Sequence, residues 1–151
     1  MSYQLLKLIH ILSATLMIGT GLGSAFYLFL TYKKSQVSTI KEVLKLVILA
    51  DTIFTTPSVI IQLITGFLLS SLMGLNYTNW FWIVLSASFV VLILWVRAAF
   101  IQVKLRNILE NKNEIPEEFH KLMNYWFYLG VPSFLGSIFI YYLMVYKPFI
   151  I

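Results

Sequence analysis

The stretch LLKLIHILSATLMIGTGLGSAF, residues 5–26, holds a single lysine and a single histidine among mostly apolar side chains. A helix of about 20 such residues crosses the ~30 Å hydrocarbon core of a membrane. Three further stretches share this character, and the four run roughly from Leu5 to Tyr32, Val43 to Leu75, Trp80 to Ile101 and Met123 to Tyr146. The sequence therefore predicts a four-span integral membrane protein.

The composition supports this interpretation. Hydrophobic residues make up 60% of the 151 residues and charged residues only 11%, and such a chain has too few polar side chains to cover a soluble domain. No stretch resembles a linker, so we expect one all-α membrane domain over residues 1–151, folded as a four-transmembrane-helix bundle. Pro57 and Pro132 lie inside spans two and four, where we expect kinks. The absence of cysteine excludes disulfides and thiolate metal sites.

The basic residues indicate an orientation. They follow spans one and three, whereas the turn SLMGLNYTN between spans two and three carries no charge. Short loops rich in lysine and arginine stay in the cytoplasm, so we expect cytoplasmic basic loops and both termini outside. These loops also account for the net charge of +5, which requires no nucleic-acid partner; the lipid bilayer is the expected surrounding.

Polar residues recur at helical spacing along span two, where they form one stripe made of Asp51, Thr55, Ser58, Gln62 and Thr65. A carboxylate in the hydrocarbon costs about 2.5–3.5 kcal/mol, so Asp51 needs a partner or a proton. Arg97 of span three lies at a similar depth, and we expect Asp51 and Arg97 to form a buried ion pair. Such a pair either fixes the helix register or marks a proton site.

Span one carries two features on opposite sides. Gly19 and Gly23 are spaced GxxxG, which favours close contact between helices. His10 lies on the other side, one to two turns into the span. His120 differs from it in depth by most of the ~30 Å core, so the two imidazoles do not reach one iron. His10 is either a histidine hydrogen-bonded to Gln62 or Tyr141, or an axial haem ligand.

Segments from all four spans resemble a known family. The segments LKLIHILSATLMIGTGLGSAF, LADTIFTTPSVIIQLITG, WVRAAFIQVKLRNI and YWFYLGVPSFL occur in this order and cover nearly the whole chain. Together they resemble the predicted integral membrane proteins grouped as Domain of Unknown Function 2269. That resemblance implies a membrane protein and brings no settled activity.

A more distant resemblance implies a cofactor. The layout is similar to the HemJ-type protoporphyrinogen oxidases, four-span bacterial proteins that bind b-type haem. The similar positions are Lys7 and His10, then Thr56, Pro57 and Gly66, and finally Val131–Pro132 and Lys147–Pro148. This resemblance implies haem b, His10 as the ligand of its iron, and the bacterial cytoplasmic (inner) membrane. The lysine that those oxidases carry early in span three is absent from NWFWIVLSASF. This absence argues against their oxidase reaction and is compatible with haem or porphyrin binding, so whether the protein is a haem-linked oxidoreductase is an open question.

Three functions compete on these grounds. The leading hypothesis is a haem- or porphyrin-binding protein whose ligand lies between the helices, against His10, Met17, Gly21, Gln62, Tyr141 and Met144. In it, Met17, Tyr141 or Met144 faces His10, and Gly21 lets a flat ring approach. The second hypothesis is an accessory or assembly subunit of a larger membrane complex, or a homo-oligomer, without a cofactor. The third is a small-solute or proton transporter that acts as an oligomer, with Asp51, Gln62 and Arg97 along its path.

Overall fold

The protein is helical throughout its membrane region. A computed structural model describes residues 2–148, and its helices are α1 (Tyr3–Lys34), α2 (Val37–Ala50), the π-helical turn η1 (Asp51–Thr55), α3 (Thr56–Leu72), α4 (Asn79–Leu109) and α5 (Glu117–Tyr146). Because α2, η1 and α3 are continuous, the described residues contain four helices long and apolar enough to cross a membrane. The predicted all-helical, four-span fold is confirmed at that level, and the bends predicted at Pro57 and Pro132 stay predictions.

Local sequence explains where the helices begin and end. The hydroxyls of Ser2 and Thr78 accept hydrogen bonds from the backbone N–H groups of Leu5 and Phe81, which caps α1 and α4. Two glutamates occupy the first turn of α5, where the helix dipole favours negative charge. Gly74 has a φ of +67° in the turn after α3, a conformation that glycine adopts without steric cost.

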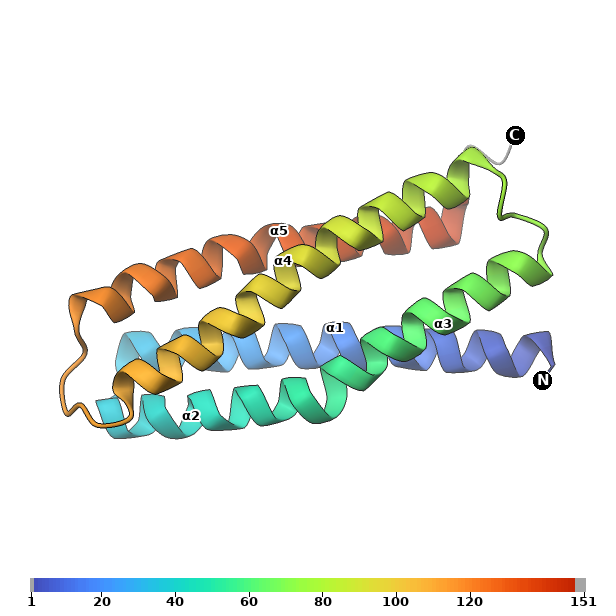
Figure 1. Cartoon of the computed structure of the whole chain (residues 1–151). Helices are drawn as coiled ribbons and strands as arrows, with labels where there is room; N and C mark the ends of the chain where they lie inside the picture. The colour runs from blue at the N-terminus through green and yellow to red at the C-terminus, as the bar shows by residue number, and fades with distance from the viewer. Residues whose placement is uncertain (1, 149–151) are drawn as a thin grey trace.

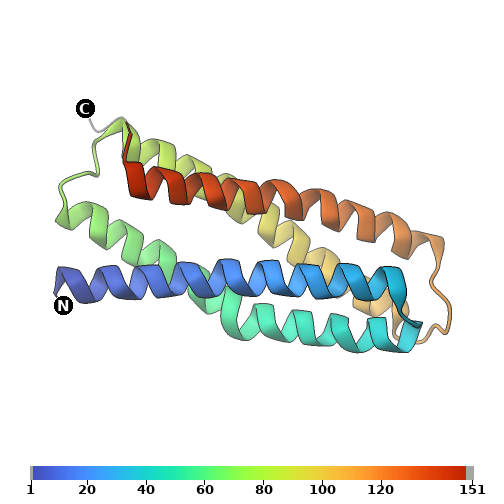
Figure 2. The same ribbon diagram turned by 180° about the vertical axis from the view of Figure 1, so that it is seen from behind.

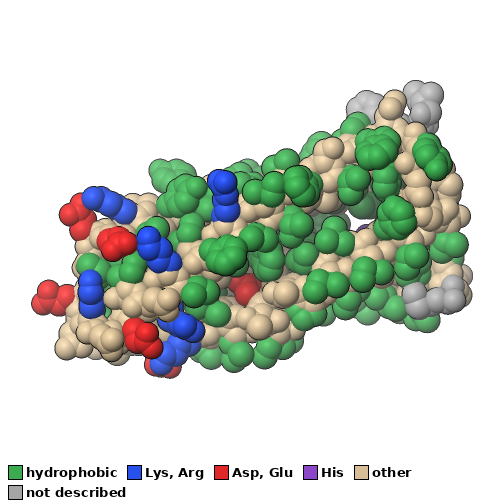
Figure 3. All heavy atoms as spheres, in the orientation of Figure 1, with side chains coloured by type: hydrophobic (Ala, Val, Ile, Leu, Met, Phe, Trp, Pro, Cys, Tyr) green, Lys and Arg blue, Asp and Glu red, His purple; other side chains and the backbone are tan. Residues whose placement is uncertain are grey.

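The bundle is packed unevenly along its length. At the end where α1 joins α2 and α4 joins α5, a core of fully buried side chains unites all these helices; it includes Leu28, Ile40, Leu44, Leu105 and Phe119. The charged side chains gather at this same end (Figure 3). We call it the loop end, and the other end, where α1 starts and α5 finishes, the terminal end (Figure 1).

At the terminal end the four spans separate into two pairs. α1 packs along α3 and α4 packs along α5, whereas α3 makes almost no contact with α4. The views from front and back both show the pairs diverging (Figures 1 and 2), and the space-filling view shows a hollow between them (Figure 3). Within the α4–α5 pair, the Trp80 indole N–H donates to the carbonyl of Leu143 at 2.7 Å.

Close helix contact occurs at a glycine other than the expected ones. A Cβ added at Gly19 or Gly23 would meet nothing within 4 Å, so this GxxxG pair makes no close contact within the described chain. The tight position is Gly136 of α5, where an added Cβ would lie 2.6 Å from Cγ2 of Val91 on α4. The Gly136–Val91 contact results from the close packing of α4 against α5. The GxxxG motif of span one gives no information about that packing.

Gly136→Ala should therefore destabilise the bundle relative to Gly130→Ala, a matched control whose added Cβ meets nothing within 4 Å. Both variants share the gain in helix propensity, so their difference measures the clash with the stiff Val91 side chain. We expect a free energy of unfolding lower by about 1–3 kcal/mol for Gly136→Ala, measured by reversible unfolding in mixed micelles. Equal stabilities would contradict this account of the α4–α5 contact.

Candidate functional site

The side chain of His10 is held on α3 by both of its ring nitrogens. His10 Nδ1 lies 2.8 Å from Thr65 Oγ1, and His10 Nε2 lies 2.9 Å from Gln62 Nε2. Gln62 and Thr65 are three residues apart, so they share one face of the helix. Of the two partners expected for a hydrogen-bonded His10, the structure provides Gln62 and not Tyr141.

The hydrogen-bond network assigns the protons of this site. The Thr65 hydroxyl donates to the carbonyl of Ile61 at 2.6 Å, so it accepts the N–H of His10 Nδ1. The amide nitrogen of Gln62 is a hydrogen-bond donor and cannot accept, so it donates to His10 Nε2. The imidazole is therefore neutral, with its proton on Nδ1 and its lone pair on Nε2. Metal-binding histidines commonly show this arrangement, in which a hydrogen bond at one nitrogen orients the other.

Two small residues complete the site. The buried hydroxyl of Ser13 lies 2.6 Å from Gln62 Oε1 and 2.9 Å from the carbonyl oxygen of His10. Its single proton points to the closer Oε1, which turns the amide nitrogen toward His10. At Gly66 an added Cβ would lie 3.2 Å from Cε1 of His10, so a larger residue would press on the ring. Helical spacing in the sequence could have indicated both residues, because Ser13 follows His10 by three positions and Gly66 follows Gln62 by four.

The other expected pocket residues lie apart from His10. Met144 packs at the edge of the cluster made by Leu75, Trp80, Val84 and Leu143, and Tyr141 is 37% exposed. By helix rise, His10 is about 10 Å from the start of α1 and Tyr141 about 8 Å from the end of α5, so both lie at similar depths. Met17 is half-buried on α1, and a Cβ at Gly21 would meet nothing within 4 Å. The structure thus joins His10 to Gln62 and places the α5 residues in the other helix pair.

The expected ion pair between Asp51 and Arg97 is not among the ion pairs of residues 2–148. Asp51 is buried, accepts a hydrogen bond from Thr55 and has Gln102 beside it, whereas Arg97 is exposed. The reason is helix phase: Ala98, Ile101, Gln102 and Leu105 form the buried face of α4, and Arg97 projects outside it. On α4, the residue that faces the polar stripe of span two is therefore the amide Gln102 and not the guanidinium Arg97.

His120 lies far from His10, as expected. At the loop end its Nδ1 is hydrogen-bonded to the hydroxyl of Tyr32, and its side chain is exposed. Residues 2–148 contain no cluster of three or more histidine, cysteine or acidic side chains able to hold a metal ion. A haem iron differs from such a site, because the porphyrin supplies four of its ligands and the protein one or two.

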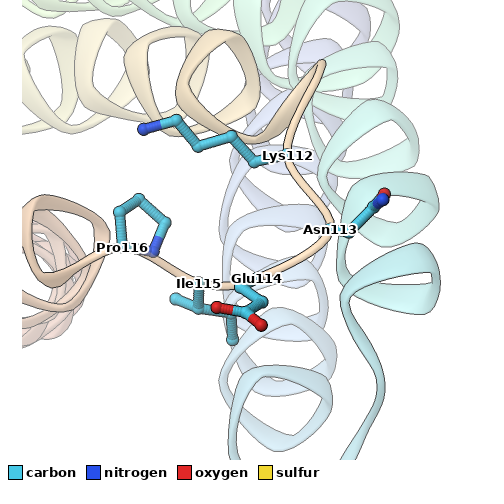
Figure 4. A pocket seen from close by; sticks show the side chains of 5 residues that line it. All are labelled: Lys112, Asn113, Glu114, Ile115 and Pro116. Carbon is cyan, nitrogen blue, oxygen red and sulfur yellow. The ribbon is translucent and has the colours of Figure 1, made fainter.

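A surface pocket at the loop end is lined by Lys112, Asn113, Glu114, Ile115 and Pro116 (Figure 4). All five residues belong to the short α4–α5 connection, and the polar ones are exposed. It therefore lies a membrane thickness away from His10 and has no part in that site.

Thr65→Val should leave the Nδ1–H of His10 without an acceptor while keeping the side-chain shape. We expect the free energy of unfolding to fall by about 1 kcal/mol, since inter-helix hydrogen bonds in membranes contribute roughly 0.6–2 kcal/mol. The matched control is Thr15→Val on α1, because the exposed Thr15 hydroxyl bonds only the carbonyl of Ile11 on its own helix. If both variants unfold alike in mixed micelles, the Thr65–His10 bond contributes nothing.

Comparison with known proteins supports an integral membrane protein. The model of the family described as "Predicted integral membrane protein (DUF2269)" matches residues 4–148, which is nearly the whole chain. No curated protein and no solved structure matches it, and the similarity to the HemJ-type oxidases stays a prediction. The chain therefore belongs to the DUF2269 family of predicted integral membrane proteins.

Proposed function

We propose that the protein binds b-type haem or a related porphyrin between its two helix pairs, with Nε2 of His10 as an axial ligand. The observation that carries this proposal is the neutral imidazole whose Nδ1–H is held by Thr65, which leaves the lone pair on Nε2. Histidine in this form is the commonest protein ligand of haem iron and of other transition metals.

The residues around His10 fit such a group. Iron binding at Nε2 requires only that the Gln62 amide move aside, and that amide keeps Ser13 as a partner. The hollow between the helix pairs lies at the same end (Figure 3). Tyr141 and Met144 on α5 and Met17 on α1 would be further residues able to hold the iron. Gly21 leaves open space beside α1, which suits a flat ring.

Each polar residue then has a distinct task. Thr65 holds the Nδ1 proton, which fixes the ring orientation and raises the basicity of Nε2. Gln62 satisfies Nε2 when no iron is bound. A bound haem supplies one-electron or oxygen chemistry, which the protein tunes through its ligands and their hydrogen bonds.

Location and partners belong to the same proposal. Lysines end α1, and most other basic residues lie at the loop end, which supports cytoplasmic loops and external termini in a bacterial inner membrane. Gly19 and Gly23 have open space beside them, and such a face suits a second helix from another copy or from a partner protein. This face is the observation that supports the accessory-subunit hypothesis.

Addition of haem to the purified protein should give a Soret band that saturates at one equivalent. His10→Ala should abolish the saturable band, because it removes the ligand, whereas His120→Ala at the loop end should keep it. Absorption titration in detergent measures this directly. A band that His10→Ala leaves unchanged, or no saturable band in the wild type, would refute the proposal.

Gln62→Leu separates a ligand role of His10 from a packing role. If haem must displace the amide from Nε2, removing the amide spares a hydrogen bond of about 1 kcal/mol, and the haem affinity should rise about fivefold. Gln4→Leu is the matched control, because Gln4 lies on the exposed side of α1 and the same amide is removed away from the imidazole ring. Unchanged or weakened haem binding in Gln62→Leu would argue against Nε2 as the iron ligand.

A further inference from the structure

A second polar centre lies deeper in the bundle, around Asp51. Asp51 is the first residue of η1 and only 7% exposed, about 20 Å along the helix from the start of α2. Its Oδ1 accepts a hydrogen bond of 2.8 Å from the hydroxyl of Thr55, and the buried side chain of Gln102 on α4 lies beside its carboxyl group. Thr55 and Gln102 are themselves buried, so the centre is shielded from the surroundings.

No cation accompanies this carboxyl group. The ion pairs of residues 2–148 are Lys45–Glu42, Lys104–Glu118 and Lys121–Glu117, and all of these side chains are exposed. The remaining charged or titratable groups on the elements that pack around Asp51 lie elsewhere. On α1 these are Tyr3, Lys7 and His10 toward the terminal end and Tyr27, Tyr32, Lys33 and Lys34 toward the loop end; Lys41 is near the start of α2, and Arg97 and Arg106 are on the exposed side of α4. α3 carries no charged residue.

We propose that Asp51 is a reversible proton-binding site within the membrane, with Gln102 of α4 as its partner. In the protonated form the carboxyl O–H donates to the amide oxygen of Gln102, and Thr55 donates to Oδ1. The carboxyl group is then hydrogen-bonded without a buried charge, the state that a low-dielectric interior favours. On release, the O–H bond breaks and the proton passes to a water molecule, and Gln102 turns its N–H₂ group toward the carboxylate.

The backbone around Asp51 is suited to respond to this change. η1 is a π-helical turn, a feature that often marks functional sites. The carbonyl of Asp51 accepts from both the N–H and the hydroxyl of Thr56, the latter at 2.9 Å. The turn joins α2 to α3, and α3 carries the partners of His10. The proton site uses none of the haem-site residues, so it stands whether or not haem is bound.

Infrared spectroscopy of the protein in liposomes tests this inference. Exposed carboxyl groups are ionised at neutral pH, so a protonated Asp51 should give a separate carboxylic C=O band there. We expect Asp51→Asn to remove the band, and the exposed control Glu118→Gln to keep it. Raising the pH should weaken the band reversibly as the proton leaves.

The Gln102→Leu variant provides a second infrared test, in which the carboxyl group of Asp51 is retained. It should shift the C=O band to higher frequency, because the hydrogen bond to the amide oxygen is lost. The proposal is overturned if no band depends on Asp51 at neutral pH, or if the band persists at every pH until the protein unfolds, as a purely structural carboxyl group would show. Loss of the band when Na⁺ replaces K⁺ at constant pH would likewise overturn it in favour of a metal-cation site.

Discussion

Hydrogen bonds across helices are the constraint on which the structure depends. In hydrocarbon there is no water to satisfy a polar group, so the stripe along η1 and α3 has to find partners within the bundle. Gln62 and Thr65 bind His10 and Ser13 of α1, and Gln102 of α4 lies beside Asp51. Among residues 2–148, no buried side-chain nitrogen or oxygen is without a partner. The stripe thereby places the second span between the first and the third.

The two ends of the bundle then serve different purposes. At the loop end, fully buried side chains from α1, α2, α4 and α5 interlock and give the protein a rigid base. Toward the terminal end, α1–α3 and α4–α5 separate, and His10 lies in the looser half. Tight packing close to the charged loops thus holds the bundle together while the two helix pairs diverge toward the terminal end. The Asp51 centre lies between these two regions.

Patterns that follow from helix periodicity alone were readable from the sequence. The four spans are long apolar runs, and the stripe from Asp51 to Thr65 needs only a 3.6-residue repeat, so its role in binding His10 could be anticipated. Pairings that depend on helix rotation could not. Arg97 and Gln102 are both polar residues of α4, and only the packing of α4 shows which one faces Asp51. The open face at Gly19 and Gly23 and the tight contact at Gly136 likewise depend on which helices pair. The π-helical turn has no periodic signature.

The protonation state of the His10 ring tests the central claim most directly, because it reports on the contact between spans one and two. Solid-state nitrogen NMR of the histidine-labelled protein in lipid bilayers, with His120→Ala used to assign the signals, measures it without any ligand. The account predicts a neutral imidazole protonated at Nδ1, with through-space contacts from the ring to the side chains of Gln62 and Thr65. An imidazolium, a proton on Nε2, or ring contacts to lipid acyl chains in place of α3 would contradict it.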